Sequence, residues 1–124
     1  MSGRWVAAAA AALALACGPA FAVDVEAARK QFVTSCGVCH AVEKDAAPRQ
    51  GPNLLGVVGR KAASLGGFAY SPALKQLDTV WTEDALDAWI ADPKAVAPGA
   101  AMVYRQADPA KRLLIIAYLK TLSN

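Results

Sequence analysis

The sequence lacks a strong excess of charge of one sign, and it lacks a hydrophobic run long enough to cross a membrane. Thirteen Lys and Arg residues face ten Asp and Glu residues, which leaves a formal net charge of +3 at pH 7. A field this weak excludes the electrostatic attraction on which nucleic-acid binding depends, so we expect no nucleic-acid partner. The apolar run Trp5 to Ala16 is shorter than the roughly 20 residues of a membrane-spanning helix.

The N-terminal stretch has the three parts of a secretory signal peptide. Arg4 supplies a positive charge, the apolar run follows, and Ala20-Phe21-Ala22 places small residues at a cleavage site. We therefore predict a signal peptide over residues 1–22 and one domain over residues 23–124, with an uncleaved anchor as the alternative. Cys17 leaves lipid attachment open, although its surroundings fit the usual pattern poorly. Without a lipid, we expect no strong membrane binding.

Side chains that bind metals through nitrogen or sulfur are scarce. Beyond the expected leader, the sequence contains one histidine, His40, and two cysteines, Cys36 and Cys39. A structural zinc site needs four ligands, so only carboxylates could complete one here. A thioredoxin-like dithiol normally follows a strand of a βαβ pattern, and strand patterns are nearly absent from this sequence.

The string Cys36-Gly37-Val38-Cys39-His40 has the spacing of a c-type haem attachment site. Two thiols can add to the two vinyl groups of haem, and the next residue can then bind the iron through its imidazole. Expected secretion favours this interpretation, because bacterial c-type haem is attached outside the cytoplasm. A structural disulfide between Cys36 and Cys39 is the plainest alternative outside the cytoplasm.

The second iron ligand can be argued by elimination. With His40 as the only histidine, one chain cannot supply two imidazoles, and Met1 belongs to the expected leader. Met102 is then the remaining thioether, and it follows Pro98-Gly99 between two predicted helices. We predict Met102 as the second axial ligand. A core methionine that fills a gap is the alternative, and the iron would then be open or bound to water.

Helical patterns dominate the sequence, and the region between residues 46 and 67 is rich in Gly and Pro. The first predicted helix runs from Asp24 to about Ser35, with Val25, Ala28 and Phe32 on one face. Two shorter helices are predicted from Ser71-Pro72 to about Leu77 and from Thr82 to a stop at Pro93. The last predicted helix runs from Asp108-Pro109 to about Leu122, with Leu113, Ile116, Ala117 and Leu119 available for packing. A loop as long as residues 46–67 is unusual in a compact domain and fits a chain that wraps a cofactor.

Six strings between residues 25 and 122, taken in order, resemble those of class I cytochromes c of the mitochondrial and soluble bacterial type. They are Cys36 to His40, Gly51 to Lys61, Phe68 to Ser71, Val80-Trp81, Pro98 to Met102 and Leu114 to Leu119. The resemblance implies an all-α fold in which crossed N- and C-terminal helices, shorter helices and loops surround one haem. Phe32 and Tyr118 would meet where the terminal helices cross, and His40 and Met102 match the family's two iron ligands.

The resemblance also implies roles around the haem. Pro52 would accept a hydrogen bond from the imidazole of His40 through its carbonyl. Arg60, Tyr70 and Trp81 would face the haem propionates as donors. Arg60 could instead be a solvated surface charge, and Trp81 could be an ordinary core residue.

Some positions depart from the mitochondrial pattern. Trp89 stands where an aromatic residue with a hydroxyl is usual, Leu74 replaces a polar residue of the pocket, and Ala100 replaces a hydroxyl near Met102. We therefore expect a drier pocket with fewer hydrogen bonds. Ser35 replaces a lysine beside the first cysteine, so the basic docking ring is weakened and the partners need not be those of the mitochondrial proteins.

The function that the resemblance implies is one-electron transfer between protein redox partners. We expect a periplasmic monomer with one covalently bound haem c and no enzymatic activity. One alternative is a tethered cytochrome subunit of a larger redox complex, which Cys17 keeps open. The other is a five-coordinate haem protein that binds small gases or acts as a peroxidase, and Met102 argues against it because its sulfur can fill the open site.

Overall fold

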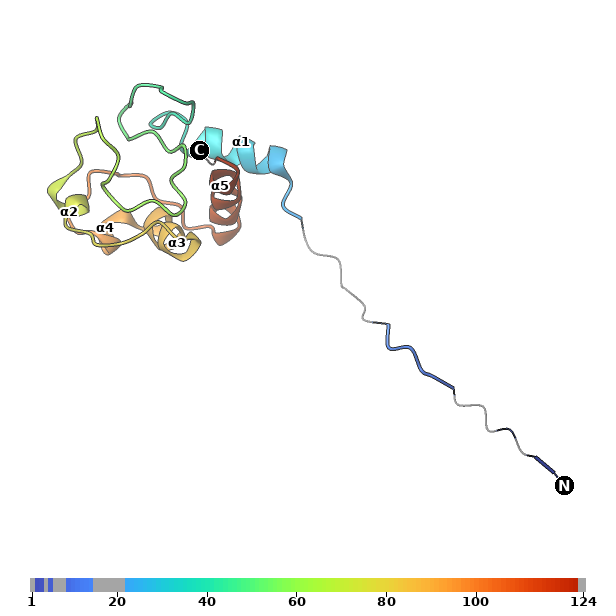
Figure 1. The fold of residues 1–124 in the computed structure, drawn as a ribbon. Helices are drawn as coiled ribbons and strands as arrows, with labels where there is room; N and C mark the ends of the chain where they lie inside the picture. Colours follow the sequence, from blue (N-terminus) through green and yellow to red (C-terminus); the bar gives the residue numbers. More distant parts are fainter. Residues whose placement is uncertain (1, 4, 6–8, 15–21, 123–124) are drawn as a thin grey trace.

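Five helices make up the regular structure (Figure 1) of a computed structural model that describes residues 2–3, 5, 9–14 and 22–122. They are α1 (Val25–Ser35), α2 (Pro72–Lys75), α3 (Glu83–Ala91), α4 (Pro93–Val96) and α5 (Pro109–Thr121). The only extended pairing within these residues is one antiparallel bridge between Lys61 and Val80. The all-α prediction is confirmed.

The expected leader falls largely outside this part of the chain. Arg4, Cys17, Ala20 and Phe21 lie outside the described residues, so the signal peptide and the lipid alternative stay predictions. None of the helices formed by the described residues has both the length and the apolar character that a membrane span requires.

The predicted helix starts are confirmed, because a side-chain oxygen caps each of them. Asp24 Oδ1 accepts from the backbone N–H of Glu26 at 2.9 Å, and Asp108 Oδ1 accepts from Ala110 N–H at 2.9 Å. Ser71 and Thr82 cap α2 and α3 in the same way. Such caps satisfy N–H groups that the first helical turn leaves unpaired.

Pro93 has two structural roles, and only the first was predicted from the sequence. It stops α3 as expected, but it also opens α4. Asp92 is the reason, because it ends α3 and its Oδ1 accepts from Ala95 N–H at 3.3 Å. Asp92-Pro93 therefore repeats the pattern of a capping residue followed by proline that was recognised at Ser71-Pro72 and Asp108-Pro109.

Helices α1 and α5 cross, as predicted (Figure 1). The rings of Phe32 and Tyr118 meet at the crossing, with their centroids 5.0 Å apart. Two expected packing positions are wrong: Val25 is 59% exposed and Leu113 is 60% exposed. Val25 is the first residue of α1, and Leu113 lies two residues, or about 200° of helix, before the fully buried Ile115.

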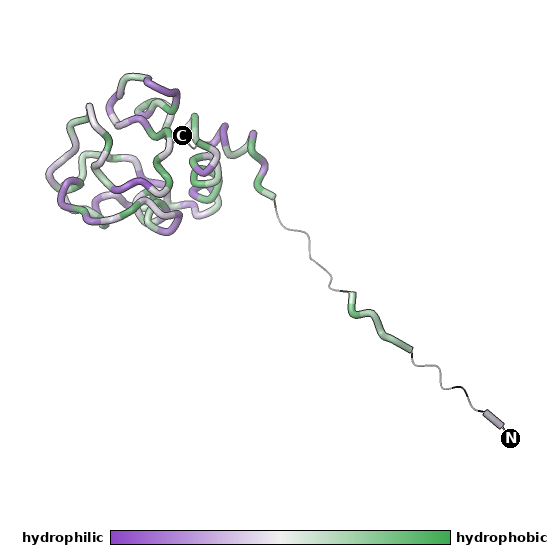
Figure 2. The backbone as a smooth tube through the Cα atoms, viewed as in Figure 1, coloured by the Kyte–Doolittle hydropathy of each residue, from purple (hydrophilic) through white to green (hydrophobic). Residues whose placement is uncertain are grey.

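The region from residue 46 to 67 contains no helix, as predicted, and consists of turns, bends and irregular backbone. Figure 2 shows hydrophobic and hydrophilic residues interspersed along the loops, whereas α5 is largely hydrophobic. Apolar loop residues such as Val57 and Leu54 reach the same core as α5. The loops thus form one wall of the interior, and the helices form the other.

Candidate functional site

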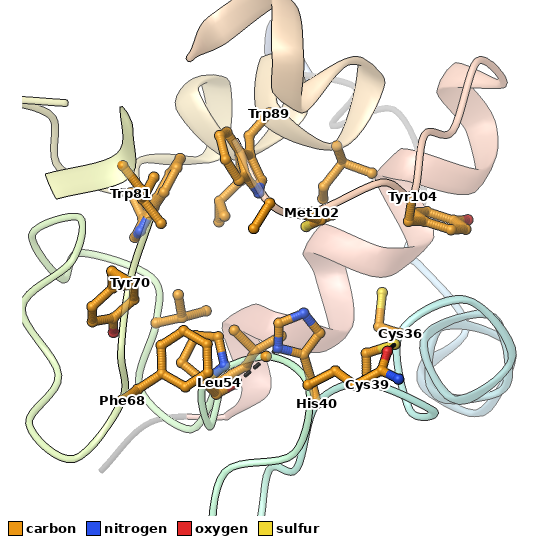
Figure 3. Close-up of a pocket in the computed structure, with 18 of the residues that line it drawn as sticks. Cys36, Cys39, His40, Leu54, Phe68, Tyr70, Trp81, Trp89, Met102 and Tyr104 are labelled. Carbon is orange, nitrogen blue, oxygen red and sulfur yellow. Dashed lines mark hydrogen bonds between the residues drawn. The ribbon is translucent and has the colours of Figure 1, made fainter. Parts of the chain in front are cut away.

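A largely apolar cavity of about 320 Å³ opens between the loop wall and the helices. Figure 3 shows His40 and the two cysteines on one side of this cavity and Met102 on the opposite side. Every site residue predicted from the sequence lines it: Cys36, Cys39, His40, Pro52, Arg60, Tyr70, Trp81 and Met102. The fold therefore brings together residues from the first third to the last quarter of the chain.

The segment from Cys36 to His40 continues α1 as a tight turn. The N–H groups of Cys39 and His40 donate to the carbonyl of Cys36 at 3.1 and 2.9 Å. Gly37 is required here, because a Cβ atom at this position would lie 2.7 Å from the carbonyl oxygen of Val33. The turn places both sulfurs and the imidazole along one edge of the cavity, where Figure 3 shows them.

The imidazole of His40 is fixed by two neighbours. Its Nδ1 lies 2.8 Å from the carbonyl oxygen of Pro52, and since a carbonyl only accepts, Nδ1 carries the proton. Gly51 lies against the ring, where a Cβ atom would come within 2.8 Å of Nε2. Burial lowers the pKa of His40, and the bond to Pro52 offsets part of that effect. The lowered pKa favours the neutral ring, in which the Nε2 lone pair is free to bind a metal.

The two thiols have different surroundings. Cys36 is buried, and this burial, reinforced by the neighbouring Cys39, raises the pKa of its thiol to about 12. Cys39 is half-buried, and its Sγ lies 3.2 Å from Oε1 of Gln50. No disulfide joins Cys36 and Cys39 in this structure. Zinc binds thiolates, whereas the buried setting of Cys36 favours uncharged sulfur, as in a thioether.

Met102 lies on the segment that joins α4 to α5. Figure 3 shows its side chain reaching into the cavity from the side opposite His40. It is partly buried and also touches the hydrophobic core, so packing and ligation are compatible at this position. The backbone before it is held by a hydrogen bond of 2.9 Å from Ala100 N–H to the carbonyl of Ala97.

Arg60 and Trp81 are held side by side by backbone pairing. Trp81 N–H donates to the carbonyl of Arg60 at 2.9 Å, next to the Lys61–Val80 bridge. The Arg60 guanidinium donates to the carbonyls of Asn53 at 3.1 Å and Leu55 at 3.2 Å. Burial lowers its pKa, and Tyr70 acts in the opposite direction. Arg60 is therefore tied to the loop wall, and the propionate role of these residues stays a prediction.

Two aromatic residues, Phe68 and Tyr104, are among the cavity residues that had no predicted role. Phe68 stacks edge-on against Tyr70, with the ring centroids 4.9 Å apart. Tyr104 also lines the cavity, and its hydroxyl accepts from Nε2 of Gln106 at 2.9 Å. Tyr104 could have been found from its position, because residues two apart on an extended segment point to the same side, and Val103 between Met102 and Tyr104 is exposed.

The donor set fits a haem. Two thiols, one neutral imidazole and one thioether meet in a cavity whose walls are mostly apolar. Trp81 and Trp89, with centroids 5.4 Å apart, form part of these walls together with Leu74 and Ile90. The expected departures at Leu74 and Trp89 thus lie in the cavity itself, where they replace polar side chains by apolar surface.

Comparison with known proteins agrees with this chemistry. The family model described as Cytochrome c matches residues 25–123. Cytochrome c2 iso-2 of Magnetospirillum fulvum is 45% identical over 73 residues, which cover 58% of this chain and 76% of that protein. Cytochrome c of Sesamum indicum is 40% identical over 98 residues, which cover 78% of this chain and 88% of that protein.

A solved structure shows the same fold. Cytochrome cH from Methylobacterium extorquens superposes with a TM-score of 0.70 and is 45% identical in sequence. The match covers 79% of this chain and 98% of that chain. The arrangement of helices around the cavity is therefore shared with a protein of known structure.

Proposed function

The chain belongs to the cytochrome c family, and on that premise we propose that it is a periplasmic single-haem carrier that passes one electron at a time between protein partners. Its cofactor is haem c. The observation that carries the proposal is the placement of His40 and Met102 on opposite sides of one apolar cavity that Cys36 and Cys39 also line (Figure 3).

Cys36 and Cys39 are the proposed attachment residues. Each thiol would add to one vinyl group, so that a sulfur–carbon bond forms and the thiol hydrogen is transferred to the vinyl carbon next to it. When bound, haem supplies an iron that takes up and releases a single electron. The two thioethers would keep the cofactor on the protein, as a carrier that moves between partners requires.

His40 and Met102 would hold the haem iron from opposite sides of the cavity. His40 is held by Pro52 at 2.8 Å and by the close approach of Gly51, so its ring needs no reorientation when the charge at the site changes. A bond from Nδ1–H to a carbonyl also raises the basicity of the opposite nitrogen. If His40 and Met102 held the iron in both oxidation states, the structural rearrangement would be small, which would favour fast electron transfer.

The apolar walls contribute to the proposed redox behaviour. Trp81, Trp89 and Leu74 exclude water from the cavity and offer few dipoles to solvate extra positive charge. A thioether ligand likewise favours the ferrous state. We therefore expect a comparatively high reduction potential. Arg60, Tyr70 and Trp81 line the cavity together and are the proposed donors to the propionates.

The proposed location is the periplasm, reached through the signal peptide over residues 1–22. Bacterial cytochromes c2 and cH are among the proteins that the chain resembles. The proposed partners are redox proteins that dock briefly, because transient redox complexes have small interfaces. We propose a monomer that carries electrons and catalyses no reaction of its own.

Intact-mass and visible spectroscopy of the protein from a periplasmic extract test the proposal. The expected mass is that of residues 23–124 plus one haem, and the reduced-minus-oxidised spectrum is that of a low-spin c-type haem. A high-spin ferric spectrum would favour the five-coordinate alternative, and a membrane-bound fraction with a lipid on Cys17 would favour the tethered subunit. A colourless protein with the mass of its amino acids alone would refute the haem function.

A further inference from the structure

Arg112 of α5 joins three separate parts of the structure. Its Nε donates to Oδ1 of Asp87 on α3 at 2.7 Å. One terminal nitrogen donates to the carbonyls of Gln106 and Ala107, both at 3.0 Å. The Arg112 side chain is only 14% exposed, although Asp87 is 48% exposed, so the guanidinium is better shielded from water than the cation of a surface pair.

The residues that Arg112 holds come shortly after Met102. Gln106 is the centre of this contact: its N–H donates to the carbonyl of Ile90 at 2.9 Å, and its side-chain oxygen accepts from Asp108 N–H at 3.1 Å. Its side-chain nitrogen donates to the hydroxyl of Tyr104. The chain is therefore fastened to α3 and α5 from residue 106 onwards.

The segment from Ala101 to Val103, which carries Met102, makes no backbone hydrogen bonds of this kind through its N–H groups. Within the part of the chain that the structure describes, the backbone N–H groups of Ala101, Met102 and Val103 have no hydrogen-bond acceptor. The stretch is held at Ala100 on one side; on the other it is held at Gln106 and by the ion pair of Arg105 with Asp92, 3.2 Å apart. The position of Met102 in the cavity thus depends on how firmly these two ends are held.

We propose that Arg112, oriented by Asp87, is a positioning residue for Met102. Because it donates to the carbonyls of Gln106 and Ala107, it keeps the segment that carries Met102 in place, with the Met102 side chain in the cavity opposite His40. The proposal rests on the proposed role of Met102 as an iron ligand. A lysine cannot replace the arginine, because an ammonium group cannot span a carboxylate and two carbonyls in the fixed geometry of a guanidinium.

The chain offers a matched control for this contact. Lys120 and Glu83 also join α5 to α3, with 3.0 Å between Nζ and Oε1. Both side chains are about half exposed, and neither makes a hydrogen bond to residues 100–108. Loss of this pair removes an α3–α5 ion pair without touching the Met102 segment.

The test is a titration of the ferric holoprotein with imidazole, which competes with Met102 for the iron. If Arg112 positions Met102, Arg112→Lys lowers the Kd for imidazole by about tenfold, as expected for losing one charge-assisted hydrogen bond. Asp87→Asn shifts the Kd in the same direction by a smaller factor. Glu83→Gln leaves it within about twofold of the original protein.

A purely structural role of Arg112 would lower the free energy of unfolding without changing the imidazole Kd, so both quantities are measured on each variant. An unchanged Kd in Asp87→Asn overturns the proposal even if Arg112→Lys does not fold. A wild-type protein without the near-red sulfur–iron band refutes the ligand role of Met102 instead. Amide hydrogen exchange over residues 100–108 is expected to accelerate in Arg112→Lys and not in Glu83→Gln.

Discussion

His40 Nδ1 donates its proton to the carbonyl oxygen of Pro52 across 2.8 Å. This bond settles which imidazole nitrogen carries the proton and leaves Nε2 facing the cavity. The acceptor is a backbone group, so no substitution at Pro52 removes it directly. The orientation of the ring is thus built into the path of the chain between residues 50 and 54.

Removing the sulfur of Met102 tests the second ligand. In Met102→Ala, we expect the weak near-red sulfur–iron band of the ferric protein to disappear while the far-ultraviolet circular dichroism stays that of a helical protein. Val103→Ala is the control, because Val103 is adjacent to Met102, is 79% exposed and has no sulfur. A band that persists in Met102→Ala assigns the ligand to another group.

The attachment residues are tested by acid–acetone extraction. The original protein should keep its haem in the precipitate, because thioether bonds survive this treatment, whereas Cys36→Ala/Cys39→Ala should release any haem it has bound. Cys17→Ala serves as the control: it should keep the haem and remain periplasmic. Haem that is extracted from the original protein contradicts the thioether assignment.

Gly51 is expected to tolerate no side chain. An added Cβ would lie 2.6 Å from Nδ1 of His40, so Gly51→Ala must displace the ring or the backbone. We expect a loss of about 1–3 kcal/mol in the free energy of unfolding, as for other overpacked sites, together with a weakened c-type spectrum. Gly66→Ala, where a Cβ meets nothing within 4 Å, should change neither. Equal effects of the two substitutions would argue against close packing on His40.

Phe32 is expected to be the main contact at the helix crossing. It is 2% exposed and touches Tyr118. Phe32→Ala should lower the free energy of unfolding by about 3–5 kcal/mol, the usual effect of emptying a buried aromatic site. The neighbouring Val33 is 49% exposed, so Val33→Ala should change stability by no more than about 0.5 kcal/mol. Urea unfolding followed by circular dichroism measures both.

Much of the fold follows from local signals in the sequence. Helix starts at Asp24, Ser71, Thr82 and Asp108 depend on residues adjacent in the chain, and each predicted cap is present. The second role of Pro93 is equally local, because it depends on the capping residue Asp92 directly before it. Boundaries that depend on capping chemistry are therefore predictable from the sequence.

Packing faces were less predictable because they depend on neighbours far along the chain. Leu113 fits an amphipathic pattern, yet the buried sector of α5 is centred on Ile115 because α1 and α3 approach from that side. The part played by Arg112 was hidden for the same reason. Its partner Asp87 lies on another helix, and its other partners are backbone carbonyls that every residue possesses.

The cavity draws its two opposed donors from distant parts of the chain, with His40 directly after α1 and Met102 shortly before α5. A bond from each to one iron would act as a reversible cross-link closing a loop of about sixty residues, which reduces the conformational freedom of the unfolded chain. Whichever oxidation state holds the Met102 sulfur more tightly would then resist unfolding better. The midpoint temperature of thermal unfolding should therefore differ between the reduced and the oxidised protein.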